Sequence, residues 1–128
     1  MKGIYVLILK VKKSIKIKIG ALGKIKFPKG SYAYVGSAQN NLEKRVARHL
    51  KKRKIKFWHI DYLLANKNVK INRIMYKSAG KSEECRIAQF LSNVEKPVKG
   101  FGSSDCKCES HLFRLKRPLL VIEGMREL

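Results

Sequence analysis

Three residue types that can take part in acid–base chemistry and anion binding lie close together in one stretch of the chain. Tyr34 falls in a short aromatic run, Ser31 to Val35, which favours a strand and is ended by Gly36. Arg45 and His49 follow in a region with helical periodicity, where residues four apart are neighbours. We therefore expect a hydroxyl, a guanidinium and an imidazole to converge across one connection from strand to helix.

These residues also have structural interpretations. A tyrosine in a buried strand, as we expect of Tyr5 and Tyr34, is more often a core residue whose hydroxyl binds a carbonyl. Arg45 and His49 would fit a basic helix face in contact with phosphate equally well. Periodicity alone leaves both interpretations open.

One carboxylate is expected to point inward. Glu84 lies three and four residues before the apolar Ile87 and Ala88, in a helix that we expect to begin with Ser82 as its cap. Stabilisation of the helix dipole would explain Glu84 and its neighbour Glu83 alike. The functional interpretation is a single carboxylate that holds Mg²⁺, a cation that keeps several waters and shares phosphate oxygens.

The cysteines offer a second candidate metal site. Cys85, Cys106, Cys108 and His111 are four candidate soft ligands, and an odd number of cysteines argues against a disulfide framework. Structural zinc sites more often have two residues between paired cysteines, so the single residue between Cys106 and Cys108 is a weak match. Buried thiols with a structural histidine are the preferred interpretation, and zinc is not an expected cofactor.

The elements that must position these residues are predicted from periodicity and turn residues. Residues 1–128 read as a single α+β domain with a small, mainly antiparallel sheet, about three flanking helices and an added N-terminal β-hairpin. Asn40 or Asn41 caps the first helix, in which Leu42, Val46 and Leu50 form a buried stripe. The predicted strands are Gly3–Leu9, Ile15–Ile19, Ile25–Phe27, Ser31–Val35, Val69–Tyr76, Ser110–Leu115 and Leu119–Glu123, and the predicted helices are Leu42–Arg53, Phe57–Asn66 and one that begins at Ser82.

The charge of the chain predicts a polyanionic partner. Thirty basic residues against nine acidic ones give a net charge of +21, so ion pairs cannot neutralise the excess. Nucleic acid is the commonest polyanion, and we expect DNA, with RNA as the alternative. The predicted phosphate contacts lie on and after the first helix: Lys44, Arg48, Lys51, Lys52 and Arg53. No apolar run is long enough to cross a membrane and no signal peptide is recognisable, so we expect a cytoplasmic protein without membrane contact.

Five ordered features resemble the GIY-YIG nuclease superfamily. These are Gly3-Ile4-Tyr5, Tyr34-Val35-Gly36, Arg45, His49 four residues later, and Glu84 in a later helix. The 28 residues from Val6 to Ala33 make the gap between the two half-motifs unusually long. A hairpin inserted there would leave the two motif strands paired as in other members.

Further segments are similar to one small archaeal branch of unassigned function, which also occurs fused to endonuclease III-like repair enzymes. These segments are residues 32–38, 58–64, 84–85 and 100–112, and with them the resemblance extends over nearly the whole chain. The resemblance implies a phosphodiester hydrolase that uses Mg²⁺ or Mn²⁺. By the matching motif positions, Tyr5 or Tyr34 would activate or position the attacking water, and His49 would assist proton transfer. Arg45 would stabilise charge on the phosphoryl oxygens, and Glu84 would bind the metal ion.

The resemblance makes a DNA endonuclease that acts on particular structures or lesions, in repair, the leading hypothesis. The first alternative is a non-catalytic nucleic-acid-binding module with the same fold. The second is a zinc-stabilised adaptor of an endonuclease III-like glycosylase that uses Cys106 to His111 as its interface.

Overall fold

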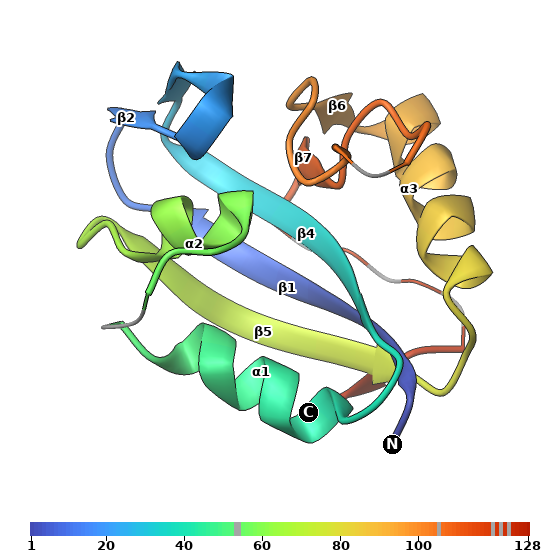
Figure 1. The fold of residues 1–128 in the computed structure, drawn as a ribbon. Coiled ribbons are helices and arrows are strands. Elements are labelled where there is room, and N and C mark those ends of the chain that lie inside the picture. Colours follow the sequence, from blue (N-terminus) through green and yellow to red (C-terminus); the bar gives the residue numbers. More distant parts are fainter. Residues whose placement is uncertain (53–54, 105, 119, 121, 123) are drawn as a thin grey trace.

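The computed structural model describes residues 1–52, 55–104, 106–118, 120, 122 and 124–128 (Figure 1). Its strands and helices occur largely in separate runs along the chain, as in an α+β domain. In chain order they are β1 (Gly3–Val11), β2 (Ile15–Lys18), the 3₁₀-helix η1 (Gly20–Leu22), β3 (Lys24–Phe27), β4 (Gly30–Ala38), α1 (Leu42–Leu50), α2 (His59–Leu64), β5 (Val69–Lys77), α3 (Ser82–Val94), β6 (Lys96–Pro97), β7 (Leu112–Arg114) and β8 (Arg126–Glu127).

Six strands form one antiparallel sheet in the order β6-β7-β4-β1-β5-β8. The longest strands, β4, β1 and β5, lie at its centre, and two buried clusters cover its two faces. The predicted fold class, a mainly antiparallel sheet flanked by three helices, is confirmed.

The extra N-terminal segment is a hairpin outside the main sheet. Strands β2 and β3 pair only with each other and form a separate two-stranded sheet (Figure 1). The prediction that the insertion leaves its flanking strands paired is confirmed, since β1 and β4 are antiparallel neighbours from Gly3–Ala38 to Val11–Gly30.

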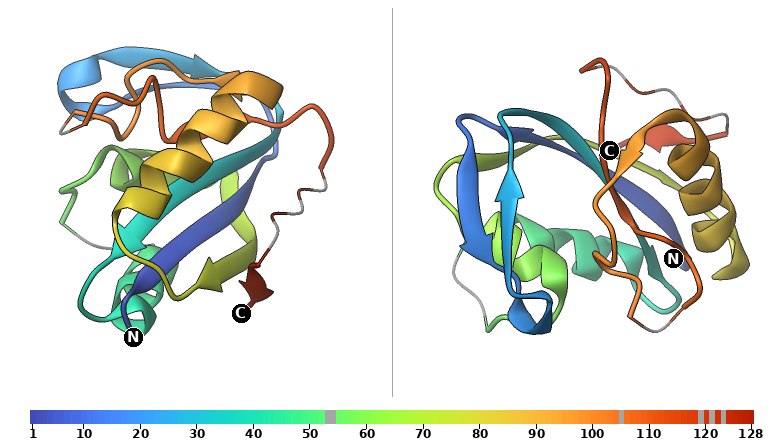
Figure 2. Two further views of the ribbon diagram at one scale, coloured as in Figure 1. Left: turned by 90° about the vertical axis from the view of Figure 1, so that its right-hand side faces the viewer. Right: turned by 90° about the horizontal axis from the view of Figure 1, so that it is seen from above.

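Helices α1 and α2 and the β2-β3 hairpin lie on one side of the sheet, and α3 packs on the other (Figure 2). Alternation along β4 sends Tyr32 and Tyr34 into the first cluster and Ala33 and Val35 into the second. Nearly every residue of β1 is buried, which agrees with a central strand covered on both faces.

The start of α1 agrees with the sequence, and its predicted stripe needs one correction. The side chain of Asn41 accepts a hydrogen bond from the amide of Lys44, so Asn41 is the cap. Leu42 and Val46 are buried, but Leu50 is 56% exposed and His49 takes the inward position. A helix has 3.6 residues per turn, so two successive steps of four residues turn the side chain away from the core.

Three further predictions are corrected. Ser82 is the first residue of α3 and does not cap it; Lys81 stands at the cap position and makes no capping hydrogen bond through its side chain. Helix α1 ends at Leu50 because Lys51 is already extended, and Arg53 lies outside the described residues. In the segment predicted as the last strand, the described residues Leu120 and Ile122 are not in a strand, and β8 begins later, at Arg126.

Among the described residues, no helix is long and apolar enough to cross a membrane.

Candidate active site

A cavity of about 510 Å³ opens beside β4 on the side of the sheet that carries α1 and α2. β7 pairs with β4 only at Tyr32–Tyr34. The C-terminal part of β4 extends past this ladder, and there Gly36 and Ser37 line the cavity. The N-terminal turn of α3 reaches the cavity from the other layer. Four of the predicted site residues therefore line one space: Tyr5, Tyr34, Arg45 and Glu84.

Tyr5 is held in place by its neighbour on β4. Tyr5 and Gly36 are opposite each other in the register of β1 and β4. A Cβ atom at position 36 would lie 2.5 Å from the hydroxyl oxygen of Tyr5, so only glycine allows the ring to lie across the neighbouring strand. Tyr5 of the first half-motif and Gly36 of the second are therefore in direct contact.

His49 lies behind Tyr5, on the buried face of α1. The Nε2 atom of His49 is 2.8 Å from the hydroxyl oxygen of Tyr5, a distance typical of a strong hydrogen bond. The imidazole is 2% exposed and also packs at 6.2 Å, between ring centroids, from Tyr34. His49 therefore reaches the cavity through Tyr5, without lining it.

Both tyrosines are neutral at ordinary pH. Burial raises the pKa of Tyr5, and the charge of Arg45 only partly opposes this effect. Burial, followed by electrostatic interaction with Tyr5 and Glu84, raises the pKa of Tyr34 well above its usual value. A tyrosinate is therefore not the resting form of either side chain.

Arg45 forms one wall of the cavity. One of its guanidinium nitrogens donates to the carbonyl of Ser37 at 3.1 Å, and the group stacks 4.5 Å from the ring centre of Trp58. These two contacts fix the plane of the guanidinium. Because the group has five N–H donors, the bond to Ser37 leaves donors for an anion in the cavity.

Arg48 has a structural contact that the sequence did not reveal. Its guanidinium donates to both oxygens of Asp61, at 2.9 and 3.0 Å, and stacks on the ring of Trp58. The Asp61 carboxylate also accepts from the amides of Phe57 and Trp58 and is fully buried. Burial alone would raise the pKa of Asp61, but Arg48 and the two amides hold it below its usual value.

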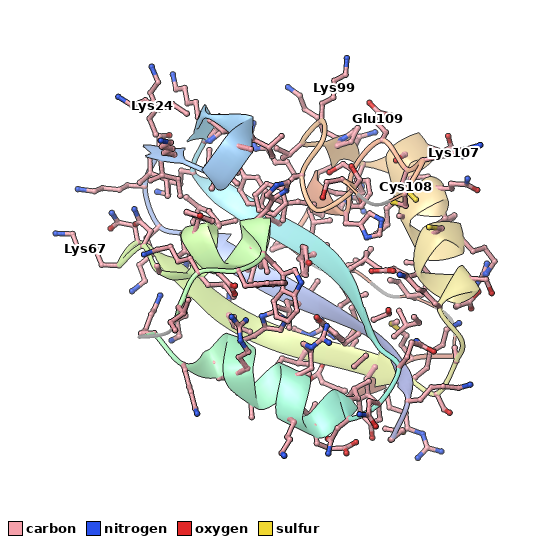
Figure 3. The ribbon with its side chains drawn as sticks, viewed as in Figure 1. Lys24, Lys67, Lys99, Lys107, Cys108 and Glu109 are labelled. Carbon is pink, nitrogen blue, oxygen red and sulfur yellow. The ribbon has the colours of Figure 1, made fainter. Side chains whose placement is uncertain are left out.

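The other predicted phosphate contacts are divided between structural and surface positions. The Lys52 ammonium donates to the carbonyls of Leu64, Asn66 and Val69, and so holds the end of α2 to the start of β5. Lys44 and Lys51 are exposed on and next to α1. Much of the remaining positive charge extends from the surface, as the exposed side chains of Lys24, Lys67, Lys99 and Lys107 do in Figure 3.

The two acidic residues in the first turn of α3 have different surroundings. Glu83 pairs with Arg86 and Lys77, which lower its pKa to about 2. Glu84 lines the cavity, and one of its carboxylate oxygens lies 3.3 Å from Nδ1 of His111. The side chain of Glu84 is 13% exposed, so the inward orientation predicted from its spacing is confirmed.

Two further cavity residues lie at the start of α2. Trp58 and His59 line the cavity at the start of α2, and Nδ1 of His59 accepts a hydrogen bond from the amide of Gly102 at 2.8 Å. That bond places the proton of the neutral ring on Nε2. Their position just before or at a helix start was compatible with a polar helix edge, and only the tertiary contact with Gly102 assigns His59 to the site.

The cysteines and His111 form a second cluster next to the cavity. The ligand atoms of Cys85, Cys106, Cys108 and His111 all lie within 4.8 Å of one another. Cys108 lies in the loop beside α3, the helix that carries Cys85 (Figure 3). Burial and the adjacent thiols of Cys85 and Cys106 raise the pKa of Cys108.

Comparison with known proteins gives a family and no function. Neither the curated proteins nor the solved structures gave a match to the chain. The model of one family matches residues 4–127, which include every element that lines the cavity. The chain therefore belongs to the family described as domain of unknown function DUF123.

Proposed function

We propose that the protein is a GIY-YIG-type endonuclease that hydrolyses phosphodiester bonds in DNA with the help of a divalent metal ion. The observation that carries the proposal is the cavity that gathers Tyr5, Tyr34, Arg45 and Glu84, with His49 hydrogen-bonded to Tyr5. Side chains from two strands and two helices, far apart in the sequence, supply a hydroxyl, a cation and a carboxylate to one space. This combination suits attack of water on a phosphodiester.

The cavity fits the metal that the proposal requires. Mg²⁺ is often held by one carboxylate together with waters and substrate phosphate oxygens, and Mn²⁺ prefers the same oxygen ligands. Glu84 offers two oxygens, so its contact with His111 through one of them is compatible with a cation on the other. The bound ion would polarise the phosphate and stabilise the leaving oxygen.

Tyr5 and His49 suit a proton relay. Because Tyr5 is neutral, it can accept a proton from the attacking water only if it releases its own. The relay requires a neutral His49 whose Nε2, 2.8 Å from the Tyr5 hydroxyl oxygen, accepts that proton. One proton passes from water to the Tyr5 oxygen as the other passes from Tyr5 to His49, which leaves an imidazolium in the buried position. Tyr34, whose ring lies beside His49, would hold the water in line.

Arg45 suits stabilisation of the transition state. Its guanidinium is fixed by Ser37 and Trp58, so donors aimed into the cavity need little reorganisation when charge develops on the phosphoryl oxygens. A lysine at this position would keep the charge but lose the planar, stacked geometry.

The substrate is expected to be DNA with exposed bases. Phe57 lines the cavity and is 75% exposed, which leaves an aromatic face for an unstacked base. The net charge of +21 supplies affinity for the backbone. Unpaired or distorted DNA meets both conditions, which favours a role in repair. The proposal includes action in the cytoplasm, next to an endonuclease III-like glycosylase. RNA is the alternative substrate.

The experiment compares cleavage of labelled single-stranded, duplex, flapped and abasic DNA, and of a matched RNA, with Mg²⁺ or Mn²⁺. Wild type runs beside Tyr5→Phe, which keeps the ring on Gly36, and Tyr32→Phe, whose hydroxyl binds the carbonyl of Pro28 away from the cavity. We expect Tyr5→Phe to slow cleavage about 10²-fold or more with unchanged affinity, and Tyr32→Phe to cleave normally. Tight binding without cleavage of any substrate would favour the non-catalytic binding module instead.

A further inference from the structure

Four soft ligands meet beside the cavity, from two separate parts of the chain. Cys85 lies in α3, Cys106 and Cys108 in the loop before β7, and His111 just before that strand. Their ligand atoms all lie within 4.8 Å of one another. Zn–S bonds of about 2.3 Å in a tetrahedron place ligands roughly 3.8 Å apart, so a small contraction would complete a coordination shell.

The orientation of His111 is that of a metal ligand. Its Nε2 faces the cluster, 3.4 Å from Sγ of Cys106. Its Nδ1 faces away, 3.2 Å from the carbonyl oxygen of Val35 and 3.3 Å from a carboxylate oxygen of Glu84. A histidine that binds a metal through one nitrogen almost always donates from the other to a carbonyl or carboxylate. Both candidate acceptors for that second hydrogen bond are present.

The loop between residues 98 and 111 is anchored in the core by Phe101, which is fully buried. It contains no helix or strand among its described residues, and it is held by backbone hydrogen bonds such as those from His111 to Phe101 and from Gly100 to Glu109. Three thiols packed together without an ion would bring several polar, ionisable groups into partial burial. A metal bound by these thiols would remove the unfavourable burial and would crosslink the loop to α3.

We propose that Cys85, Cys106, Cys108 and His111 bind one structural Zn²⁺ ion in a tetrahedral Cys₃His site. Three thiolates and one imidazole are ligands that zinc prefers, and four protein ligands leave no open position for catalysis. The one-residue gap between Cys106 and Cys108, which argued against zinc in the sequence, is offset by the distant thiol of Cys85.

The site would also support the cavity. Gly102 and Ser104, which lie in the same loop, line the cavity, and His111 contacts Glu84. This consequence rests on the proposed function; binding of zinc does not.

The test is the metal content of the full-length chain, purified under reducing conditions without chelator and freed of any affinity tag. We expect about one zinc per chain by elemental analysis. Replacement by Co²⁺ should give the visible absorption and thiolate charge-transfer bands of a tetrahedral site with sulfur ligands.

Variants identify the ligands. Cys108→Ser and His111→Asn should each lower zinc retention at least tenfold after dialysis against a weak chelator, and mass spectrometry should find all three wild-type thiols reduced. The matched control is His59→Asn, which removes a cavity histidine outside the cluster and should retain one zinc per chain.

A wild-type chain that neither contains zinc nor binds added Zn²⁺ or Co²⁺ would overturn the proposal, as would a Cys106–Cys108 disulfide after reducing purification. The metal content of the wild-type chain decides the proposal even if a variant fails to fold. Stoichiometric zinc in a protein that cleaves no nucleic acid would uphold this site and contradict the endonuclease, whereas cleavage by a zinc-free chain would do the reverse.

Discussion

The ring of Tyr5 lies across Gly36, its partner in the antiparallel pair of β1 and β4. This contact explains why a glycine stands in the middle of a buried strand, where it is otherwise unfavourable. The glycine lets the ring lie close to the backbone of β4, and in that position the hydroxyl reaches His49 at 2.8 Å. The geometry of the site therefore depends on the lack of a side chain at position 36.

Gly36→Ala should lower the free energy of unfolding by about 1–3 kcal/mol, because the added methyl group would overlap the ring of Tyr5. Thermal or denaturant unfolding measures the change. Gly80→Ala is the control, since a Cβ atom there has no neighbour within 4 Å. Equal stability of the two variants would show that the ring of Tyr5 does not lie on Gly36.

Asp61→Ala should destabilise the protein by about 3 kcal/mol at neutral pH, because it leaves Arg48 without its buried partner and two amides without an acceptor. In wild type the folded-state pKa of Asp61 is lowered, so its contribution is complete above an ordinary aspartate pKa of about 4. That contribution is lost as the pH falls through the lower, folded-state pKa.

Denaturant unfolding across this pH range would test the linkage. The difference between wild type and Asp61→Ala should shrink as the solution becomes more acidic. A difference that stays constant down to the lowest pH at which wild type is folded would contradict the assigned ionisation.

Phe57→Ala should weaken binding of single-stranded DNA by about tenfold, since stacking of one base on an aromatic side chain is worth about 1–3 kcal/mol. Phe57 is 75% exposed at the cavity, so its loss should leave stability unchanged. Phe90→Ala is the matched control, an exposed phenylalanine on α3 that does not line the cavity. Fluorescence anisotropy at fixed salt gives both affinities, and equal values would remove Phe57 from the interface.

The sequence predicted the sheet, the helices and the convergence of Tyr34, Arg45 and His49, because each depends on local periodicity and on one short connection. The family resemblance added Tyr5 and Glu84. It placed Leu50 in the core and His49 beside it, whereas the 3.6-residue repeat reverses the two. Strict steps of four residues follow a helix face for only about two turns.

Contacts between distant segments could not be predicted from the spacing of residues in the sequence. Cys85 joins Cys106 and Cys108 only because α3 packs beside the loop before β7, and His59 enters the site through contacts with Phe101 and Gly102 of that loop. Similarly, nothing in the spacing of Arg48 reveals that a buried Asp61 binds its guanidinium. Each of these relationships is set by tertiary packing, which a single sequence does not encode as a periodic signal.

The measurement that tests the central claim most directly is single-turnover cleavage of DNA by two variants, each with one substitution, at adjacent positions. Glu84→Gln removes the charge of the carboxylate in the cavity, and Glu83→Gln removes the charge of its neighbour, which pairs outward with Lys77 and Arg86. DNA affinity and zinc content are measured for both.

We predict that Glu84→Gln lowers the rate at least 10²-fold with DNA affinity retained, while Glu83→Gln cleaves at nearly the wild-type rate. Cleavage that survives Glu84→Gln, or that falls equally in both variants, would contradict the assignment of this cavity as the active site.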